Sequence, residues 1–521
     1  MSIIRSLSVL CNARRAAGVA TLFLACMAAD ARLAQAEPLR TDNPAALGAG
    51  KKKYPEFEEA RKLLLKQDVD GALEVLNAAA AAHSELASGR VLLASIYYAS
   101  NRAADGRVML EKAVVETPDD PEPYLFMADQ ALRERQWTIA SMLSEKAVVL
   151  SQAYKGDAER KKDLQKRALL IAGTAAKGRE DWETSRKALS ALVKLAPSDA
   201  AGHFQLGCVL FELKKDKEAY AELQAAARLD EDLPSAESTM GHLWDSAKDR
   251  AKAEEWMKRA VKTDGKKLNT RLDVAKWLFN VRRFDEAKEQ IDEALLLDSD
   301  SQEALFWAGR IARFAKNNKD ARRFLEKAYL QAPGSTVVAN ELALALGEIS
   351  EEDRKRAFSL AQATFNQNKN NPESAATLGW ICYQLGRTEE AEQLLTAVAG
   401  TNQVTPDAIF YYATLADARN RGDVVKPYLE VALKNEAPFA YRDEAQQLLD
   451  RLNKTSPGEA KETATKPAKS GTKAAPTSST PGATGAKKTA AAKSDAPKAD
   501  APKADAPKTD APKAPAVKTA P

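Results

Sequence analysis

Residues that commonly carry catalysis or bind metals are few and scattered in this chain of 521 residues. The three histidines, His83, His203 and His242, lie far apart, and the four cysteines form no C-x-x-C pair. Zinc peptidases use H-E-x-x-H and serine hydrolases use G-x-S-x-G, because these spacings bring ligands or a nucleophile to one place. Neither pattern occurs here. The sequence therefore predicts no catalytic residue, no metal site and no enzyme.

Gly48–Lys52 matches part of a phosphate-binding loop. Such a loop needs a glycine five residues before its second glycine, and a Ser or Thr directly after its lysine. Ala45 and Lys52 occupy those two positions, and no strand is predicted before them. We therefore expect no nucleotide, no other cofactor and no small-molecule substrate.

The net charge of +4 is unevenly distributed along the chain. Residues 1–36 carry +3 and residues 455–521 carry +6, which leaves −5 for residues 37–454. A basic fold would favour nucleic acid or another anionic surface. Because the basic excess lies at the two ends, no specific nucleic-acid partner is predicted.

The amino terminus has the pattern of a secretory signal. Arg14 and Arg15 precede an uncharged apolar stretch at 16–29, and residues 34–36 (AQA) supply a small-x-small cleavage pattern. The apolar stretch is shorter than the roughly 20 residues that span a membrane. We expect residues 1–36 to be a signal peptide and the protein to be exported, to the periplasm, the cell envelope or the medium. An uncleaved N-terminal membrane anchor is the alternative.

Signal cleavage would remove Cys11 and Cys26 and leave Cys208 and Cys382 on two different predicted helices. We interpret the remaining pair as small, buried apolar residues. A disulfide or a reactive thiol is the alternative.

The carboxyl-terminal tail, residues 454–521, is rich in Lys, Ala and Pro. From Thr455 onward it has ten prolines and no Leu, Ile, Phe, Tyr or Trp. Such a segment buries too little apolar surface to offset the entropy of ordering, so we predict that it is disordered. It is a spacer or, alternatively, a basic tether to an anionic polymer such as cell wall, a membrane surface or nucleic acid.

Between the two ends, small residues recur in register, mostly 34 positions apart. One series is Ala72, Gly106, Ala140, Ser185, Ala219, Ala253, Ala287, Ala321, Ala357, Ala391 and Val425. A second is Ala60, Ala94, Ala128, Gly173, Gly207, Gly241, Ala275, Gly309, Ala345, Gly379 and Ala413. A third is Ala79, Ala113, Ala147, Leu192, Ala226, Ala260, Ala294, Ala328, Thr364, Val398 and Ala432. Short side chains at fixed positions allow two antiparallel helices to approach closely.

Proline also follows the repeat, since Pro121, Pro234, Pro372 and Pro406 all fall at the start of a unit, where a missing N–H costs little. The clearest unit is 372–398, with Leu378-Gly379 on a first helix and a Gly386-Arg387 turn.

This pattern resembles the tetratricopeptide repeat, a helix–turn–helix unit of about 34 residues. The resemblance covers residues 53–439 and implies an all-α, right-handed superhelical solenoid of about eleven units. Residues 37–52 are predicted as a linker, and 440–453 as a helix that caps the open end. Eleven extra residues near 154–165 are charged, and we interpret them as lengthened helices with a loop.

The resemblance also implies a partner-binding groove lined by fixed positions of each first helix. Carried onto this sequence, the groove residues are Phe204, Phe211, His242, Asp245, Lys276, Phe279, Asn280, Phe306, Arg310, Arg313, Trp380 and Tyr383. Rings beside cations suit a peptide with acidic groups. The alternative is that many of these rings pack between the repeats. We therefore expect a non-enzymatic scaffold for a protein or peptide partner.

Overall fold

The structure is a computed structural model that describes residues 54–401 and 404–454. These residues form helices and turns and contain no strand. The predicted signal peptide, linker and basic tail lie outside the described residues, as do Cys11 and Cys26.

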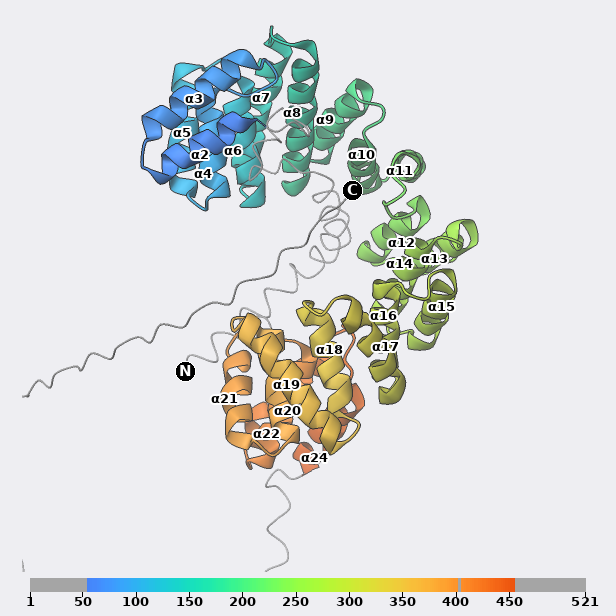
Figure 1. Cartoon of the computed structure of the whole chain (residues 1–521). Coiled ribbons are helices and arrows are strands. Elements are labelled where there is room, and N and C mark those ends of the chain that lie inside the picture. Colours follow the sequence, from blue (N-terminus) through green and yellow to red (C-terminus); the bar gives the residue numbers. More distant parts are fainter. Residues whose placement is uncertain (1–53, 402–403, 455–521) are drawn as a thin grey trace, which may run out of the picture. The chain divides into compact units, whose positions relative to one another are not determined.

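Within the described residues, eleven consecutive helical hairpins, here called units 1 to 11, precede a last helix, α24 (Arg442–Lys454) (Figure 1). The first helices of the units are α2 (Pro55–Leu65), α4 (Gly89–Ala99), α6 (Pro121–Arg133), α8 (Ala158–Gly178), α10 (Ala200–Glu212), α12 (Ala236–Ser246), α14 (Leu268–Asn280), α16 (Gln302–Phe314), α18 (Thr336–Gly347), α20 (Pro372–Gln384) and α22 (Pro406–Ala418). The second helices are α3 (Val69–Ala82), α5 (Ala103–Glu116), α7 (Trp137–Ala153), α9 (Trp182–Leu195), α11 (Asp216–Leu229), α13 (Arg250–Asp264), α15 (Phe284–Leu297), α17 (Asn318–Gln331), α19 (Glu351–Gln367), α21 (Thr388–Ala399) and α23 (Gly422–Lys434).

The three series of small residues form the contacts between these helices. Every residue of the three series is buried, which confirms the prediction of an all-α solenoid of repeated hairpins. A Cβ added to Gly309 would lie 2.4 Å from Leu325 Cγ, so the two helices of unit 8 approach more closely than a larger residue would allow. In unit 4, Ser185 replaces alanine, and its Oγ donates a hydrogen bond to Gly173 O over 2.7 Å.

Helix starts follow from polar caps. Asp or another short polar residue accepts a hydrogen bond from a first-turn N–H at many units, as Asp199 Oδ1 does from Gly202 N over 2.8 Å. Three of the four repeat prolines lie at the start of a first helix. Pro234 does not, because α12 begins at Ala236 with Ser235 as its cap. That proline therefore belongs to the preceding turn.

The turns inside the units share a strained backbone. One residue per turn has a positive φ at ten of the units: Gln67, Asn101, Arg135, Glu180, Lys214, Lys248, Arg282, Lys316, Gly386 and Asn420. Glycine favours this left-handed conformation because it has no Cβ, yet Gly386 is the single glycine of the series. The chain thus adopts the same turn in ten units, in seven of them with a residue type other than Gly or Asn, for which this conformation is unfavourable.

The eleven extra residues lengthen the helices of units 3 and 4. Helix α7 has 17 residues, α8 has 21, and a short loop joins them. The added turns of α8 carry Arg160 and Arg167, whose guanidinium groups both contact Glu122 at the start of α6. Arg160 Nη1 also donates to Ser84 O over 3.3 Å. The insertion therefore ties α8 to units 1 and 3.

Candidate partner-binding face

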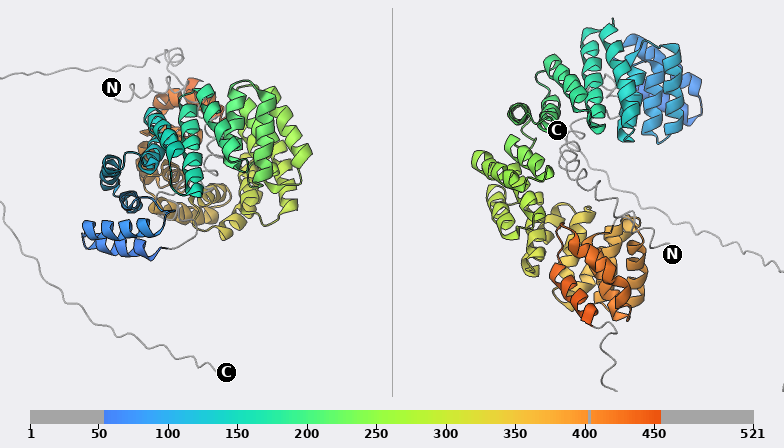
Figure 2. Two further views of the ribbon diagram at one scale, coloured as in Figure 1. Left: turned by 90° about the horizontal axis from the view of Figure 1, so that it is seen from above. Right: turned by 180° about the vertical axis from the view of Figure 1, so that it is seen from behind.

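One continuous face of the described residues is built from first helices. Each second helix packs between the first helix of its own unit and that of the next, as α17 packs between α16 and α18. Most neighbouring first helices from α6 onward also contact each other directly, most closely α6 with α8, α18 with α20 and α20 with α22. Figure 2 shows the succession of hairpins from two further sides. We call the face that the first helices share the inner face.

The twelve predicted groove residues divide into two groups. Seven keep partial or full exposure: His242, Asp245, Lys276, Asn280, Phe306, Arg310 and Tyr383. Five are buried: Phe204, Phe211, Phe279, Arg313 and Trp380. The buried rings pack between helices, so the structure places them where the alternative interpretation had them and not on an open surface. Phe279, for example, lies 4.7 Å from Phe314 and 5.3 Å from Trp307 between ring centroids.

In units 6 to 8, charged residues pair across neighbouring first helices. His242 Nε2 lies 3.0 Å from Asp273 Oδ1, and Lys276 Nζ forms an ion pair with Glu303. Burial disfavours the charged form of Asp273, but the charge and hydrogen bond of His242, aided by Ser238 and Lys276, outweigh burial and lower the pKa of Asp273 to about 2. This part of the face is a row of paired charges.

Arg310 connects this charged row to aromatic rings. Its guanidinium carbon lies 5.1 Å from the centroid of Phe279 and 5.3 Å from that of Trp307, and Nε lies 3.0 Å from Glu341 Oε1. About 31% of its side chain is exposed. A partly exposed cation above aromatic rings can bind a carboxylate or a further ring of a partner.

At the carboxyl-terminal units, the inner face is covered by the chain itself. The Tyr441 ring stacks on Phe410 at 5.0 Å and lies edge-on to Trp380 at 5.7 Å. Its hydroxyl donates a hydrogen bond to Glu348 Oε1 over 2.8 Å, and Lys316 Nζ lies 4.4 Å from the ring centroid. Each of these partners belongs to a first helix or to the residues that directly follow one.

Buried polar groups gather beside Tyr441. Arg313 is paired with Glu341. Burial raises the pKa of the nearby Asp407 to about 6; the charge of Arg313 opposes this rise, and the charge of Glu341 adds to it. Burial also raises the pKa of Tyr411 and Tyr441 well above the ordinary tyrosine value. Burial thus favours the neutral form of all three side chains.

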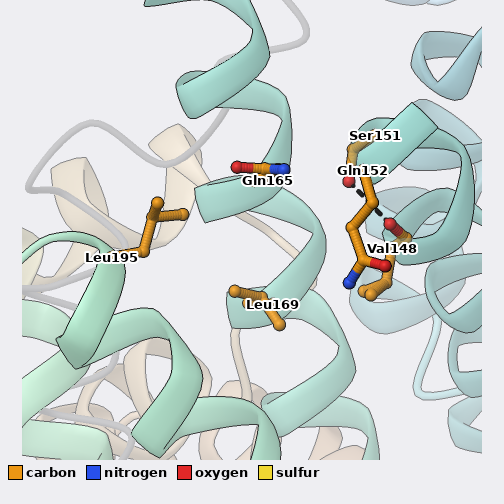
Figure 3. Close-up of a pocket in the computed structure, with 6 residues that line it drawn as sticks. All are labelled: Val148, Ser151, Gln152, Gln165, Leu169 and Leu195. Carbon is orange, nitrogen blue, oxygen red and sulfur yellow. Dashed lines mark hydrogen bonds between the residues drawn. The ribbon is translucent and has the colours of Figure 1, made fainter. Parts of the chain in front are cut away.

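Elsewhere, one small pocket lies between α7, α8 and α9 (Figure 3). Its volume is about 150 Å³, and it is lined by Val148, Ser151, Gln152, Gln165, Leu169 and Leu195. Pockets that enclose small-molecule ligands measure roughly 300 to 1,000 Å³. Ser151 Oγ is already hydrogen bonded to Val148 O. This pocket is therefore smaller than the sites that enclose small-molecule substrates.

A search of the described residues for clusters of His, Cys, Asp and Glu that could hold a metal ion found none. In the same part of the chain, no helix has both the length and the apolar character needed to cross a membrane. Cys208 and Cys382 are buried and are not joined by a disulfide, which fits the interpretation of small apolar residues.

Sequence reasoning missed the residues that organise the inner face at its carboxyl-terminal end. Glu341 is the one charged residue in the largely apolar helix α18, which is a signal that the sequence offered. The sequence places Tyr441 only in the predicted capping helix. Its contact with Glu348 joins residues 93 positions apart, and a local sequence pattern cannot predict such a contact. Glu348 and Asp407 were missed for the same reason.

Residues 172–234, 275–336 and 348–410 match family models described as tetratricopeptide repeat. No curated protein matches the chain significantly. A tetratricopeptide repeat protein from Parabacteroides merdae is 12% identical, with a TM-score of 0.34 over 55% of this chain and 98% of its own. Yeast Tom70 is 13% identical, with a TM-score of 0.33 over 77% of this chain and 95% of its own. YrrB, described as a TPR protein with an unusual peptide-binding site, is 20% identical, with a TM-score of 0.26 over 38% of this chain and 97% of its own.

Proposed function

Because this chain is a tetratricopeptide repeat protein, we propose that it is a non-catalytic scaffold that holds a protein or peptide partner on its inner face. Repeats of this family generally serve protein interaction, and none of the catalytic patterns sought in the sequence is present. The observation that carries the proposal is the set of partly exposed side chains in units 7 and 8, with Lys276 on α14 and Phe306 and Arg310 on the neighbouring first helix α16.

The chemistry of this row favours a partner segment with carboxylates. Lys276 and Arg310 each hold one carboxylate of the chain itself, Glu303 and Glu341. Arg310 keeps part of its guanidinium accessible, and a planar guanidinium can bind two carboxylate oxygens at once. Trp307, which lies next to Arg310 and is half-buried, supplies apolar area that a bound side chain would remove from water.

The test replaces the two inner cations by neutral residues of similar length. Lys276→Gln with Arg310→Gln should reduce partner capture at least tenfold in affinity purification from the native source. The control is Lys288→Gln with Arg323→Gln on the second helices α15 and α17 of the same units, where both cations also sit in ion pairs. If the two double variants capture the partner equally well, the partner does not bind the inner face through Lys276 and Arg310.

We also propose export to the cell envelope, on the strength of the amino-terminal pattern of residues 1–36. The amino-terminal residue of the mature protein tests this directly. Cleavage after Ala36 supports a signal peptide, and an intact Met1 in the membrane fraction supports the anchor.

A second candidate function uses the tail, whose residues 455–521 carry a net charge of +6. It would hold an anionic polymer of the envelope while the solenoid acts as a spacer. Deletion of residues 455–521 should then release the protein, and retention by the full chain should weaken with salt because exposed charges are screened. If retention in the envelope changes neither with salt nor on deletion of residues 455–521, the tail is not a tether.

A further inference from the structure

The segment between α23 and α24, together with the first residues of α24, lies on the inner face. We call residues 435–444 the closing segment. Glu444 Oε1 lies 2.6 Å from Lys316 Nζ although 128 positions separate them in sequence. Near its other end, Glu436 Oε2 lies 4.0 Å from Arg250 Nη2. The closing segment therefore spans from the turn of unit 8 to the start of α13 in unit 6.

Tyr441 anchors this segment. It is buried against Trp380, Phe410 and Tyr411, and its hydroxyl reaches Glu348. Ala440 N adds a hydrogen bond to Asp407 Oδ1 over 3.2 Å. A buried aromatic ring with a satisfied hydroxyl, flanked by ion pairs, is the arrangement that dominates binding energy at protein interfaces.

The fit of the closing segment is incomplete. Tyr411 OH, Arg313 Nη1 and Glu444 Oε2 are buried and have no hydrogen-bond partner. Arg442 lies near Arg282, and burial together with that neighbouring charge lowers the pKa of Arg442. Unpaired buried polar groups and the repulsion between the charges of Arg442 and Arg282 both oppose the closed arrangement. A partner segment that has no cation at the position of Arg442, and that pairs Tyr411 OH and Arg313 Nη1, would bind the same surface better.

We propose that the inner face formed by α16, α18, α20 and α22 binds a partner segment that has an aromatic residue followed, three positions later, by an acidic residue. The closing segment, with Tyr441 and Glu444 at this spacing, occupies the surface in the free protein. This inference rests on the proposed function and names the chemistry of the partner. The aromatic ring enters between Trp380 and Phe410, and the acid pairs with Lys316.

The test supplies the same chemistry in trans. A fluorescent peptide with the sequence of residues 434–446 is titrated against the full chain and against the full chain with Tyr441→Ala and Glu444→Gln. The intact protein should bind the peptide at least tenfold more weakly than the variant, because a tethered segment competes at an effective concentration near millimolar. The same peptide with Tyr441→Ala should lose binding to the variant.

Equal binding of the peptide by the two proteins, or equal binding of the two peptides, would overturn the inference, provided that circular dichroism shows the same helicity in both proteins. If the variant loses helicity, hydrogen exchange of the intact protein decides. Saturating peptide should speed exchange at residues 436–444, and unchanged exchange there counts against the inference. Partner capture that depends on Lys276 and Arg310 would still support the proposed function, so the two ideas fail separately.

Discussion

Arg313 Nε donates a hydrogen bond to Glu341 Oε2 over 2.7 Å, and about 6% of each side chain is exposed. This ion pair joins α16 to α18 in the interior of the array. Burial opposes the ionised form of Glu341, but the charges of Arg313 and Arg310 hold its pKa below the ordinary value. If either residue of this pair is removed, the other is left as a buried charge without a counter-charge.

Glu341→Ala should lower the free energy of unfolding by about 3 kcal/mol or more, because it leaves the Arg313 guanidinium buried without its carboxylate. Glu326→Ala on α17 is the matched control. Glu326 is also shared by two arginines, Arg322 and Arg356, but in a more exposed place, so its loss should cost less than about 1 kcal/mol. Urea unfolding followed by circular dichroism measures both, and similar costs would contradict the buried role of Glu341.

Asp407 gives the carboxyl-terminal units a pH dependence. Its pKa is raised to about 6, first by burial, so the folded state binds a proton that the unfolded state releases near pH 4. Its contribution therefore favours folding at low pH and is lost as pH rises from about 4 to about 6. Asp407→Asn keeps the oxygen that accepts from Ala440 N and removes the charge.

The stability of the Asp407→Asn variant relative to the unaltered protein should thus increase between pH 4 and pH 7, by at most about 3 kcal/mol. Thermal unfolding of both proteins at matched pH values measures this difference. Because other carboxylates titrate in both proteins, only the difference reports on Asp407. A difference that is constant with pH would show that Asp407 titrates normally.

Gly309 tests the close approach of two helices. Gly309→Ala places a Cβ within 2.4 Å of Leu325 Cγ, and Leu325 is fully buried, so the substitution should cost about 1 to 3 kcal/mol. Gly334→Ala is the control, because no atom lies within 4 Å of the added Cβ. The control should cost nothing measurable in the same thermal unfolding assay. A tolerated Gly309→Ala would mean that the helices of unit 8 separate freely.

Lys248 tests the repeated turn. It has a φ of 64°, which costs a side-chain-bearing residue about 1 kcal/mol, so Lys248→Gly should stabilise the protein by up to that amount. The same substitution at Lys187, an exposed position inside α9, should destabilise by about 1 kcal/mol. Opposite shifts of the unfolding midpoint support the strained turn, and a loss at both positions contradicts it.

The repeat could be predicted from sequence because each unit is held by local contacts that recur every 34 residues. Ala219, Ala253 and Ala287 are buried at equivalent positions, so the spacing alone identified them. The sequence indicates the turn at Gly386 but not at Lys248, because glycine is typical of positive φ and lysine is not. The local sequence pattern therefore predicts the helices, but it does not predict the backbone conformation of most turns.

The candidate site was harder to predict because it depends on how successive units rotate past one another. Phe279 and Trp380 occupy first-helix positions typical of a groove, yet neighbouring units and Tyr441 cover them. The pairing of Lys316 with Glu444 joins residues 128 positions apart, and no repeat period brings them together. Such contacts follow from tertiary packing and require the structure.

Cys382 provides a prediction about reactivity. Its thiol is buried in α20, and burial raises its pKa to about 11. Because the thiolate is the reactive form, a thiol reagent at pH 8 should modify Cys382 in the folded protein at least a hundredfold more slowly than in urea. Cys382→Ala in the full chain identifies its share of the signal, and Cys208→Ala identifies that of the other buried cysteine. Rapid modification of Cys382 without denaturant would show that unit 10 opens readily, and would make this cysteine a reactive thiol after all.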